Sequence, residues 1–213
     1  MSIWTTYHVE LQIRELLCGG VPKDPSTLLT FTRVRTGHED DITTGQVEEL
    51  EETVTPDTLS PDNLKNVTTF QRDEHGLFLH ERNIKAMLKE CAQVLGFNKK
   101  LRGLKQVNQH GLFVKGQLET DRVYLEDPET GEYMTAVSGE LVSPVHAWTG
   151  SSIKRTEYVQ RPILRFDLWV LADSPWTDEA WQRVWMLAQE NGIGACRSQG
   201  YGKFDLLAFT RTE

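Results

Sequence analysis

Residues 192–204 read GIGACRSQGYGKF, and this stretch holds four glycines within eleven residues. It follows a strongly apolar strand pattern over 162–171 and an amphipathic helix pattern that opens at Thr177. An alternating strand pattern resumes over 203–210. Strand, helix, glycine-rich loop and strand in this order make half of a ferredoxin-like split βαβ unit, so the sequence predicts an α+β fold.

The first half of the chain supplies candidates for the other half of that unit. Residues 7–17 alternate between apolar and polar side chains, which is typical of a half-buried strand. A hairpin pattern around the turn at 73–76 leads into residues 82–95, whose apolar positions follow helical spacing up to Gly96. We therefore expect a single domain over residues 1–213 with a ferredoxin-like, RRM-like core.

Two segments are predicted to be insertions into this core. Residues 38–62 hold nine acidic residues and no lysine or arginine, so we expect an acidic, solvated insertion at about 38–66. A second, β-rich insertion is expected at about 98–140. The net charge of −8 comes from 23 basic and 31 acidic residues, and without those nine acids the balance is 23 to 22. A nearly neutral body does not exclude nucleic acid as a partner.

Composition excludes several other classes of protein. Apolar residues make up 38% of the 213 residues and charged residues 25%, as in soluble globular chains. The apolar runs are far shorter than a membrane span, and the N-terminal residues lack the pattern of a secretory signal. Cys18, Cys91 and Cys196 are too scattered for a disulfide framework or a zinc pair. We expect a cytoplasmic protein with no membrane contact, no metal and no cofactor.

The glycine-rich stretch differs from the known phosphate-binding loops. A Rossmann fingerprint or a Walker loop would need glycine at position 197, where this chain has arginine. The Walker loop would also need serine or threonine at position 204, where this chain has phenylalanine. Two interpretations remain, a tight crossover from helix to strand and a loop whose backbone approaches a ligand.

The spacing of the stretch closely resembles the signature loop of the RAMP superfamily, the ferredoxin-like RNA-binding subunits of CRISPR effector complexes. A second segment, RDEHGLFLHERNIK at 72–85, is similar in layout to the Arg-Asp turn, apolar strand and helix opening of the backbone subunits. Residues 81–83 read Glu-Arg-Asn where that family has Gly-Ser-Ser, and Lys85 takes the place of the family's lysine. A later GSSIKR at 150–155 is interpreted as a second basic loop.

The resemblance implies a diverged or stand-alone member of that superfamily. Such a protein binds single-stranded guide RNA within a ribonucleoprotein of antiviral defence, beside other subunits or copies of itself. RNA is held through its backbone and by stacking, which requires cations, amide-rich loops and aromatic side chains. The residues predicted to bind RNA are Gly192, Gly194, Arg197, Ser198, Gln199, Gly200, Tyr201, Gly202, Lys203, Lys85, Lys99, Lys100, Arg102, Lys105, Lys154 and Arg155.

Two alternatives come from other classes of protein. The first is a protein-interaction module, for example one encoded by a phage, that docks through its acidic segment. The second is a metal-independent endoribonuclease. For that activity the weak catalytic candidates are His8 and His146, because an imidazole suits proton transfer near neutral pH, and Asp62, which precedes the Arg-Asp turn. Catalysis is not the expected function.

Overall fold

The computed structural model describes residues 3–23, 67–97, 112–118, 120–147, 150–172 and 176–212. Among these residues two α-helices, α4 (Glu81–Val94) and α7 (Asp178–Asn191), accompany twelve strands in two sheets. The predicted α+β class is confirmed. The acidic insertion expected at about 38–66 lies outside the described residues.

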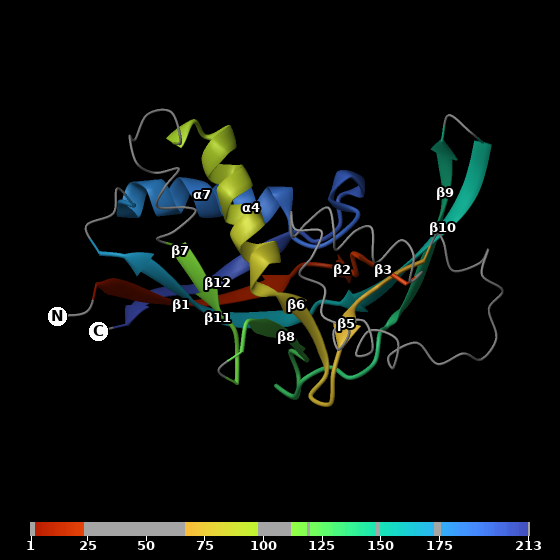
Figure 1. Ribbon diagram of the computed structural model, residues 1–213, viewed down its shortest axis with the longest axis horizontal. Helices are drawn as coiled ribbons and strands as arrows, with labels where there is room; N and C mark the ends of the chain where they lie inside the picture. Colours follow the sequence, from red (N-terminus) through yellow and green to blue (C-terminus); the bar gives the residue numbers. More distant parts are fainter. Residues whose placement is uncertain are drawn as a thin grey trace, which may run out of the picture.

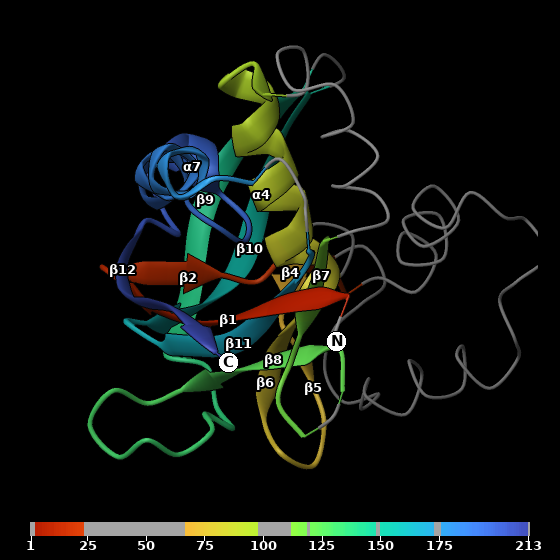
Figure 2. The same ribbon diagram turned by 90° about the vertical axis from the view of Figure 1, so that its left-hand side faces the viewer.

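The main sheet is antiparallel and carries both helices on one face (Figures 1 and 2). Its strands β12 (Phe204–Thr212), β1 (Trp4–Ile13), β11 (Ile163–Leu171) and β7 (Leu112–Lys115) lie in that order across the sheet. Along the chain, α4 lies between β1 and β7, and α7 connects β11 to β12. Two strand–helix–strand units therefore interleave in one sheet.

Beyond β7 the same edge of β11 continues onto β8 (Arg122–Glu126), which pairs with Ile163 and Leu164. The chain leaves the sheet after β7 and returns at β8, and the two ends of this excursion touch. A Cβ on Gly116 would lie 1.9 Å from the carbonyl oxygen of Arg122. The segment expected as a β-rich insertion thus contributes two strands to the main sheet, because both find their partner in β11.

Two short strands extend the sheet past β8. They are β6 (Leu77–His80), which pairs with β8, and β5 (Gln71–Arg72), which forms the expected hairpin with β6. This hairpin leads directly into α4, so the start of the helix is held at the edge of the sheet.

The second sheet branches from the main one at β10. Its members are β2 (Leu16–Cys18), β3 (Val21–Pro22), β4 (Val67–Thr69), β9 (Gly139–Ala147) and β10 (Gly150–Gln160). The β9–β10 hairpin projects away from the helices (Figure 1). The interpretation of 150–155 as a basic loop is wrong, because these residues pair one by one with β9 and form a regular strand.

The strand expected over 7–17 is split between the two sheets. It leaves the main sheet after Ile13 and joins the second sheet at Leu16. Between these points the backbone N–H of Arg14 donates to the carbonyl of Lys203, and the backbone carbonyl of Glu15 accepts the N–H of Arg161. One continuous polar–apolar pattern therefore serves two sheets.

The hydrophobic core lies between the helices and the main sheet. Helix α7 buries Trp181, Val184 and Trp185 against it, and α4 buries Ile84 and Leu88, as their helical spacing predicts. The side chain of Thr177 caps α7 by accepting the N–H of Ala180 at 3.2 Å. In the part of the chain that the structure describes, no helix is long and apolar enough to cross a lipid bilayer.

Candidate nucleic-acid interface

Three of the four glycines in the loop allow backbone segments to cross at close range. Gly192 and Gly202 adopt φ of +73° and +78°, and a Cβ on Gly202 would lie 1.9 Å from the carbonyl oxygen of Ile193. Gly194 has φ +84°, and a Cβ there would lie 2.8 Å from the carbonyl oxygen of Cys18. The tight-crossover interpretation therefore accounts for these three glycines.

Hydrogen bonds fix the inner half of the loop to β2. The N–H of Gly202 donates to Leu16 at 2.8 Å, and the N–H of Ala195 donates to Cys18 at 3.0 Å. Gly200 differs from the other glycines, since no atom lies within 4 Å of a Cβ built there, although its φ is +90°. The outer half, with the short 3₁₀ turn Arg197–Gln199, faces outward from this anchored base.

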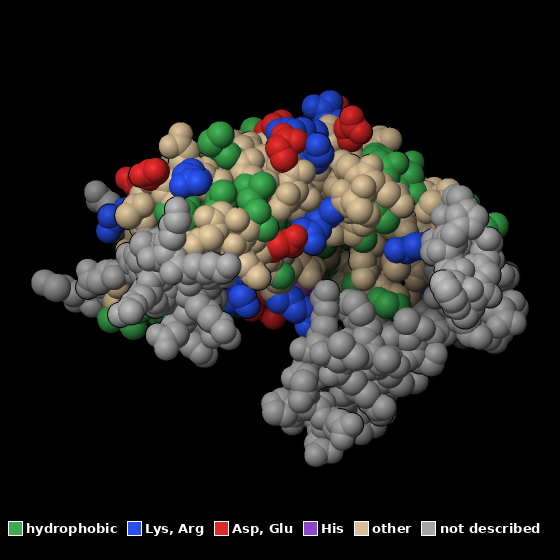
Figure 3. Space-filling model, turned by 90° about the horizontal axis from the view of Figure 1, so that it is seen from above, with side chains coloured by type: hydrophobic (Ala, Val, Ile, Leu, Met, Phe, Trp, Pro, Cys, Tyr) green, Lys and Arg blue, Asp and Glu red, His purple; other side chains and the backbone are tan. Residues whose placement is uncertain are grey.

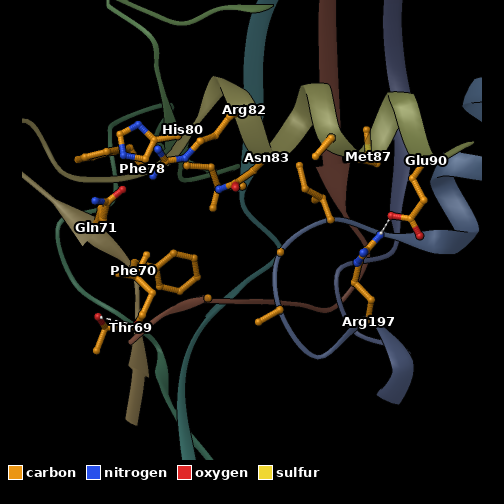
Figure 4. A pocket seen from close by; sticks show the side chains of 17 residues that line it. Thr69, Phe70, Gln71, Phe78, His80, Arg82, Asn83, Met87, Glu90 and Arg197 are labelled. Atoms are coloured by element: carbon orange, nitrogen blue, oxygen red, sulfur yellow. Dashed lines mark hydrogen bonds and ion pairs between the residues drawn. The ribbon is translucent and has the colours of Figure 1, made fainter. Parts of the chain in front are cut away.

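A groove of about 260 Å³ opens between the glycine-rich loop and α4 (Figure 4). The loop lines it with Gly194 and Arg197, and α4 lines it from its first to its third turn with Arg82, Asn83 and Glu90. Residues of β3 to β6 complete the wall. The two segments that carry the sequence resemblance, far apart along the chain, thus meet on one groove.

Polar groups gather at both ends of the groove. His80, Arg82 and Asn83 lie together at one end, and Glu90 and Arg197 lie at the other (Figure 4). Arg197 Nη1 donates to Glu90 Oε2 at 2.9 Å, and Glu90 is the one carboxylate among the described residues that line the groove. An anionic ligand would therefore compete with Glu90 for Arg197.

The far wall of the groove is positioned by a buried carboxylate. Glu157, on β10, accepts the backbone N–H of Phe70 at 3.1 Å and the Arg72 guanidinium at 2.7 Å. The phenyl ring of Phe70 is itself buried and lines the groove. Glu157 thereby fixes the segment that faces the glycine-rich loop.

The Arg-Asp turn before α4 has a structural role. Asp73 Oδ1 accepts the N–H groups of His75 and Gly76, while Oδ2 accepts Tyr124 Oη–H at 2.7 Å and the Arg122 guanidinium. Burial pushes the pKa of Asp73 upward, but the bonds from Tyr124, the two backbone N–H groups and Arg122 together hold it below its ordinary value. The carboxylate locks the β5–β6 turn and, with it, the entry to the helix.

The remaining predicted residues of the loop lie outside the groove lining. Lys203 Nζ is paired with Glu190 Oε2 at 3.0 Å. Ser198 and Gln199 are exposed, and Tyr201 is half-buried. Basic and acidic side chains are interspersed over the helix-bearing face (Figure 3), so the cations act as local contacts within a mixed surface.

The described basic residues predicted elsewhere lie outside the groove lining. Lys85 lies on α4 but contacts the ring of Phe113 on β7, with its Nζ 4.5 Å from the centroid, and burial lowers its pKa. Lys154 is half-buried and Arg155 is exposed, both on β10. Outside the described residues lie Lys99, Lys100, Arg102 and Lys105.

Of the catalytic candidates, His8 is placed away from the groove. His8 Nδ1 lies 3.0 Å from Asp167 Oδ1, across the β1–β11 pair. Because Val9 is buried under the helices, His8 lies on the opposite face of the sheet. His146 lies in β9, and Asp62 is outside the described residues. Within the described ranges, no three His, Cys, Asp or Glu side chains are grouped to hold a metal ion.

Sequence reasoning missed several residues that line the groove, above all Arg82, Asn83 and Glu90. A signal for them exists, since positions 82, 83, 86 and 90 share one face of a helix. Arg82 and Asn83 also lie at the positions of the family's Gly-Ser-Ser. They were therefore interpreted as a departure from the family pattern and not as polar side chains that could bind a ligand.

Comparison with known proteins adds no assignment. No protein-family model matches the chain, and no curated protein matches it. The class that the geometry defines is therefore an α+β chain with a polar groove between a glycine-rich loop and a helix start.

Proposed function

We propose that this chain is a single-stranded RNA-binding subunit of a ribonucleoprotein, built on a ferredoxin-like core and related to the RAMP superfamily. The succession β1, α4, β7, β11, α7, β12 follows the β-α-β-β-α-β order of that core. The antiparallel arrangement β12-β1-β11-β7 with both helices on one face supports the same proposal.

The meeting of the two resembling segments on one groove carries the proposal. The groove offers two guanidinium groups, from Arg82 and Arg197, and the amide of Asn83. Guanidinium groups bind phosphate oxygens through directed pairs of N–H donors. These donors stand at both ends of the groove and would engage successive phosphates of one strand.

The size of the groove favours part of a chain over a whole ligand. Its volume of about 260 Å³ is below the range of about 300–1,000 Å³ typical of small-molecule pockets. A polymer that enters at one end and leaves at the other needs only a short gripped section. Phe70 and Phe78 give the wall apolar surface beside the polar ends, which suits a nucleotide.

The β9–β10 hairpin supports assembly with another subunit or with a second copy. Val142 and Ile153 are 63% and 62% exposed. Val142 is opposite Arg155 in the register, so Val142 and Ile153 share one face of the hairpin. We infer that this exposed apolar pair on a projecting element is the docking surface. This observation is also the one that favours a protein-interaction module, the second candidate function.

Fluorescence anisotropy with labelled single-stranded RNA at low salt tests the proposal. We expect the Arg82→Glu/Arg197→Glu double variant to bind at least about tenfold more weakly, because two contacts become repulsive. Lys89→Glu/Arg211→Glu is the control for the charge change, since it reverses the same number of charges at two exposed residues that lie outside the groove lining.

Two outcomes would contradict the proposal. Wild-type protein that ignores RNA at low salt would leave the protein-interaction module as the better candidate. Equal losses in the double variant and in Lys89→Glu/Arg211→Glu would show that binding follows net charge and not the groove. Shortened RNA products in a buffer with a chelator would instead point to the endoribonuclease, and His8→Ala would then be the variant that separates binding from cleavage.

A further inference from the structure

Three aromatic side chains from three strands cluster at one end of the main sheet. Trp4 on β1 contacts Phe113 on β7 edge to face, with ring centroids 5.5 Å apart, and lies 6.4 Å from the ring of Trp169 on β11. All three side chains are only half-buried. Leu168 and Val170 are buried beneath the helices, so Trp169 between them points to the opposite face of the sheet.

Two lysines lie over these rings. Lys115 Nζ is 5.1 Å from the ring centroid of Trp169, and Lys85 Nζ is 4.5 Å from that of Phe113. Asp167, opposite Lys115 in the register, is engaged with His8 at 3.0 Å, and Glu81 at the start of α4 interacts electrostatically with both lysines. Flat π-faces beside ammonium groups match the two parts of a nucleotide, since bases stack on aromatic rings and phosphates pair with cations. We define the aromatic–lysine patch as the side chains of Trp4, Lys85, Phe113, Lys115 and Trp169.

The patch and the groove are neighbours around the start of α4. Arg82 lines the groove, and Lys85, three residues later, belongs to the patch. Residues three apart are adjacent on the surface of a helix. Lys85 therefore connects the two sites, since it is next to Arg82 on the helix surface and its ammonium group lies over the ring of Phe113.

We propose that the aromatic–lysine patch is a second site for single-stranded RNA, which stacks one or two bases of a strand whose backbone is held in the groove. This inference rests on the proposed function and adds to it a recognition step for bases. It also gives Lys85 a place in RNA binding away from the glycine-rich loop. The patch reads no sequence, because every base has a face that stacks.

Photocrosslinking locates the bases. Oligo(U) that carries 4-thiouridine is irradiated on the intact protein, and crosslinked peptides are identified by mass spectrometry. We expect crosslinks in the peptides that hold Trp4 or Trp169, in addition to peptides of the groove.

Affinity measurements on matched variants complete the test. Trp169→Leu keeps an apolar side chain without a ring, and we expect about tenfold weaker binding of oligo(U). Tyr133→Leu is its control, because Tyr133 is also half-buried but stacks on Tyr124 elsewhere in the fold. Lys115→Ala changes an exposed residue that folding tolerates, and we expect the slope of log affinity against log salt to fall by about 0.7. Lys89→Ala should leave that slope unchanged.

The outcomes separate this inference from the proposed function. If Arg82→Glu/Arg197→Glu abolishes binding while Trp169→Leu and Lys115→Ala bind normally and no crosslink falls on the patch, the inference is wrong and the groove remains. Failure of the wild-type protein to bind any RNA overturns both. A change in the mass of the assembly on Trp169→Leu, with RNA affinity unchanged, would make the patch a protein-docking surface.

Discussion

At the scale of single residues, Gly202 is the position in the loop where we expect a substitution to be most destabilising. It combines φ of +78° with a crossing that would place a Cβ 1.9 Å from a backbone oxygen. We expect Gly202→Ala to lower the free energy of unfolding by at least about 3 kcal/mol, since left-handed strain and an atomic overlap add together. Urea denaturation measures the loss.

Gly200→Ala is the matched control for that prediction. Its φ of +90° imposes a similar backbone strain, but a Cβ there meets no atom within 4 Å. We expect a cost of about 1–2 kcal/mol. Equal costs at the two positions would mean that the crossing at Gly202 relaxes freely, and the close approach would then not explain the glycine.

Glu90 is the second residue whose substitution gives a testable result, because it pairs with Arg197 in the groove. It holds Arg197 in the groove by a partly exposed ion pair, and such pairs are worth about 0.2–1 kcal/mol. Because RNA phosphate must displace this carboxylate, we expect Glu90→Gln to bind RNA up to about fivefold more tightly. Anisotropy titration measures the change.

Glu190→Gln tests whether that gain belongs to the groove. Glu190 pairs with Lys203 and Arg14 outside the groove lining. We expect its affinity for RNA to stay as in the wild type. A gain in Glu190→Gln without one in Glu90→Gln would move the binding site to the side of the loop that carries Lys203.

At the scale of elements, the β5–β6 turn predicts a pH dependence. The pKa of Asp73 is lower in the folded protein than in the unfolded chain, where aspartate titrates near about 3.9. Between these two pKa values the unfolded chain binds more protons than the folded protein. The stabilisation that Asp73 contributes is therefore fully present above the unfolded pKa and is lost as pH falls through the folded pKa.

Asp73→Asn should therefore flatten the fall in stability between about pH 4 and pH 2. It should also destabilise the protein at pH 7 by about 1–3 kcal/mol, because Arg122 loses its charged partner. Urea denaturation from pH 2 to pH 7 checks both effects. An unchanged slope would show that other carboxylates control acid unfolding.

The same scale shows what local sequence patterns can predict. Helices α4 and α7 and strand β11 agree with their patterns, since each buries one continuous face, and β12 agrees in its bounds although Phe204 is its one buried side chain. The β9–β10 hairpin has no comparable core-facing pattern and was missed. The split after Ile13 was also missed, because the partners of each half, β11 and β10, lie about 150 residues away.

The candidate site was likewise predictable only in part from the local sequence. Glycine spacing identified Gly194 and Arg197, since a crossover of this kind demands glycine at fixed positions. The groove itself depends on the packing of α4 against the loop, which no local pattern contains. Lys85 was predicted to bind RNA at the helix opening by analogy, whereas its side chain contacts the ring of Phe113.

At the scale of the whole molecule, salt dependence tests how the sites combine. The chain carries a net charge of −8, so RNA must bind through local cations against a repulsive background. Arg82 and Arg197 serve the groove, and Lys85 and Lys115 serve the patch. Each phosphate neutralised adds about 0.7 to the slope of log affinity against log salt.

Oligo(U) of increasing length should therefore show two regimes. Short oligomers that fill only the groove should give a slope of magnitude about 1.4, and longer ones that also reach the patch about 2.8. The step between the regimes should vanish in Lys85→Ala/Lys115→Ala, while Lys89→Ala keeps it. A single slope near 1.4 at every length would confine RNA to the groove. A slope near zero would mean that neither Arg82 nor Arg197 contacts phosphate, and the exposed face of the β9–β10 hairpin would then become the better place to look for a partner.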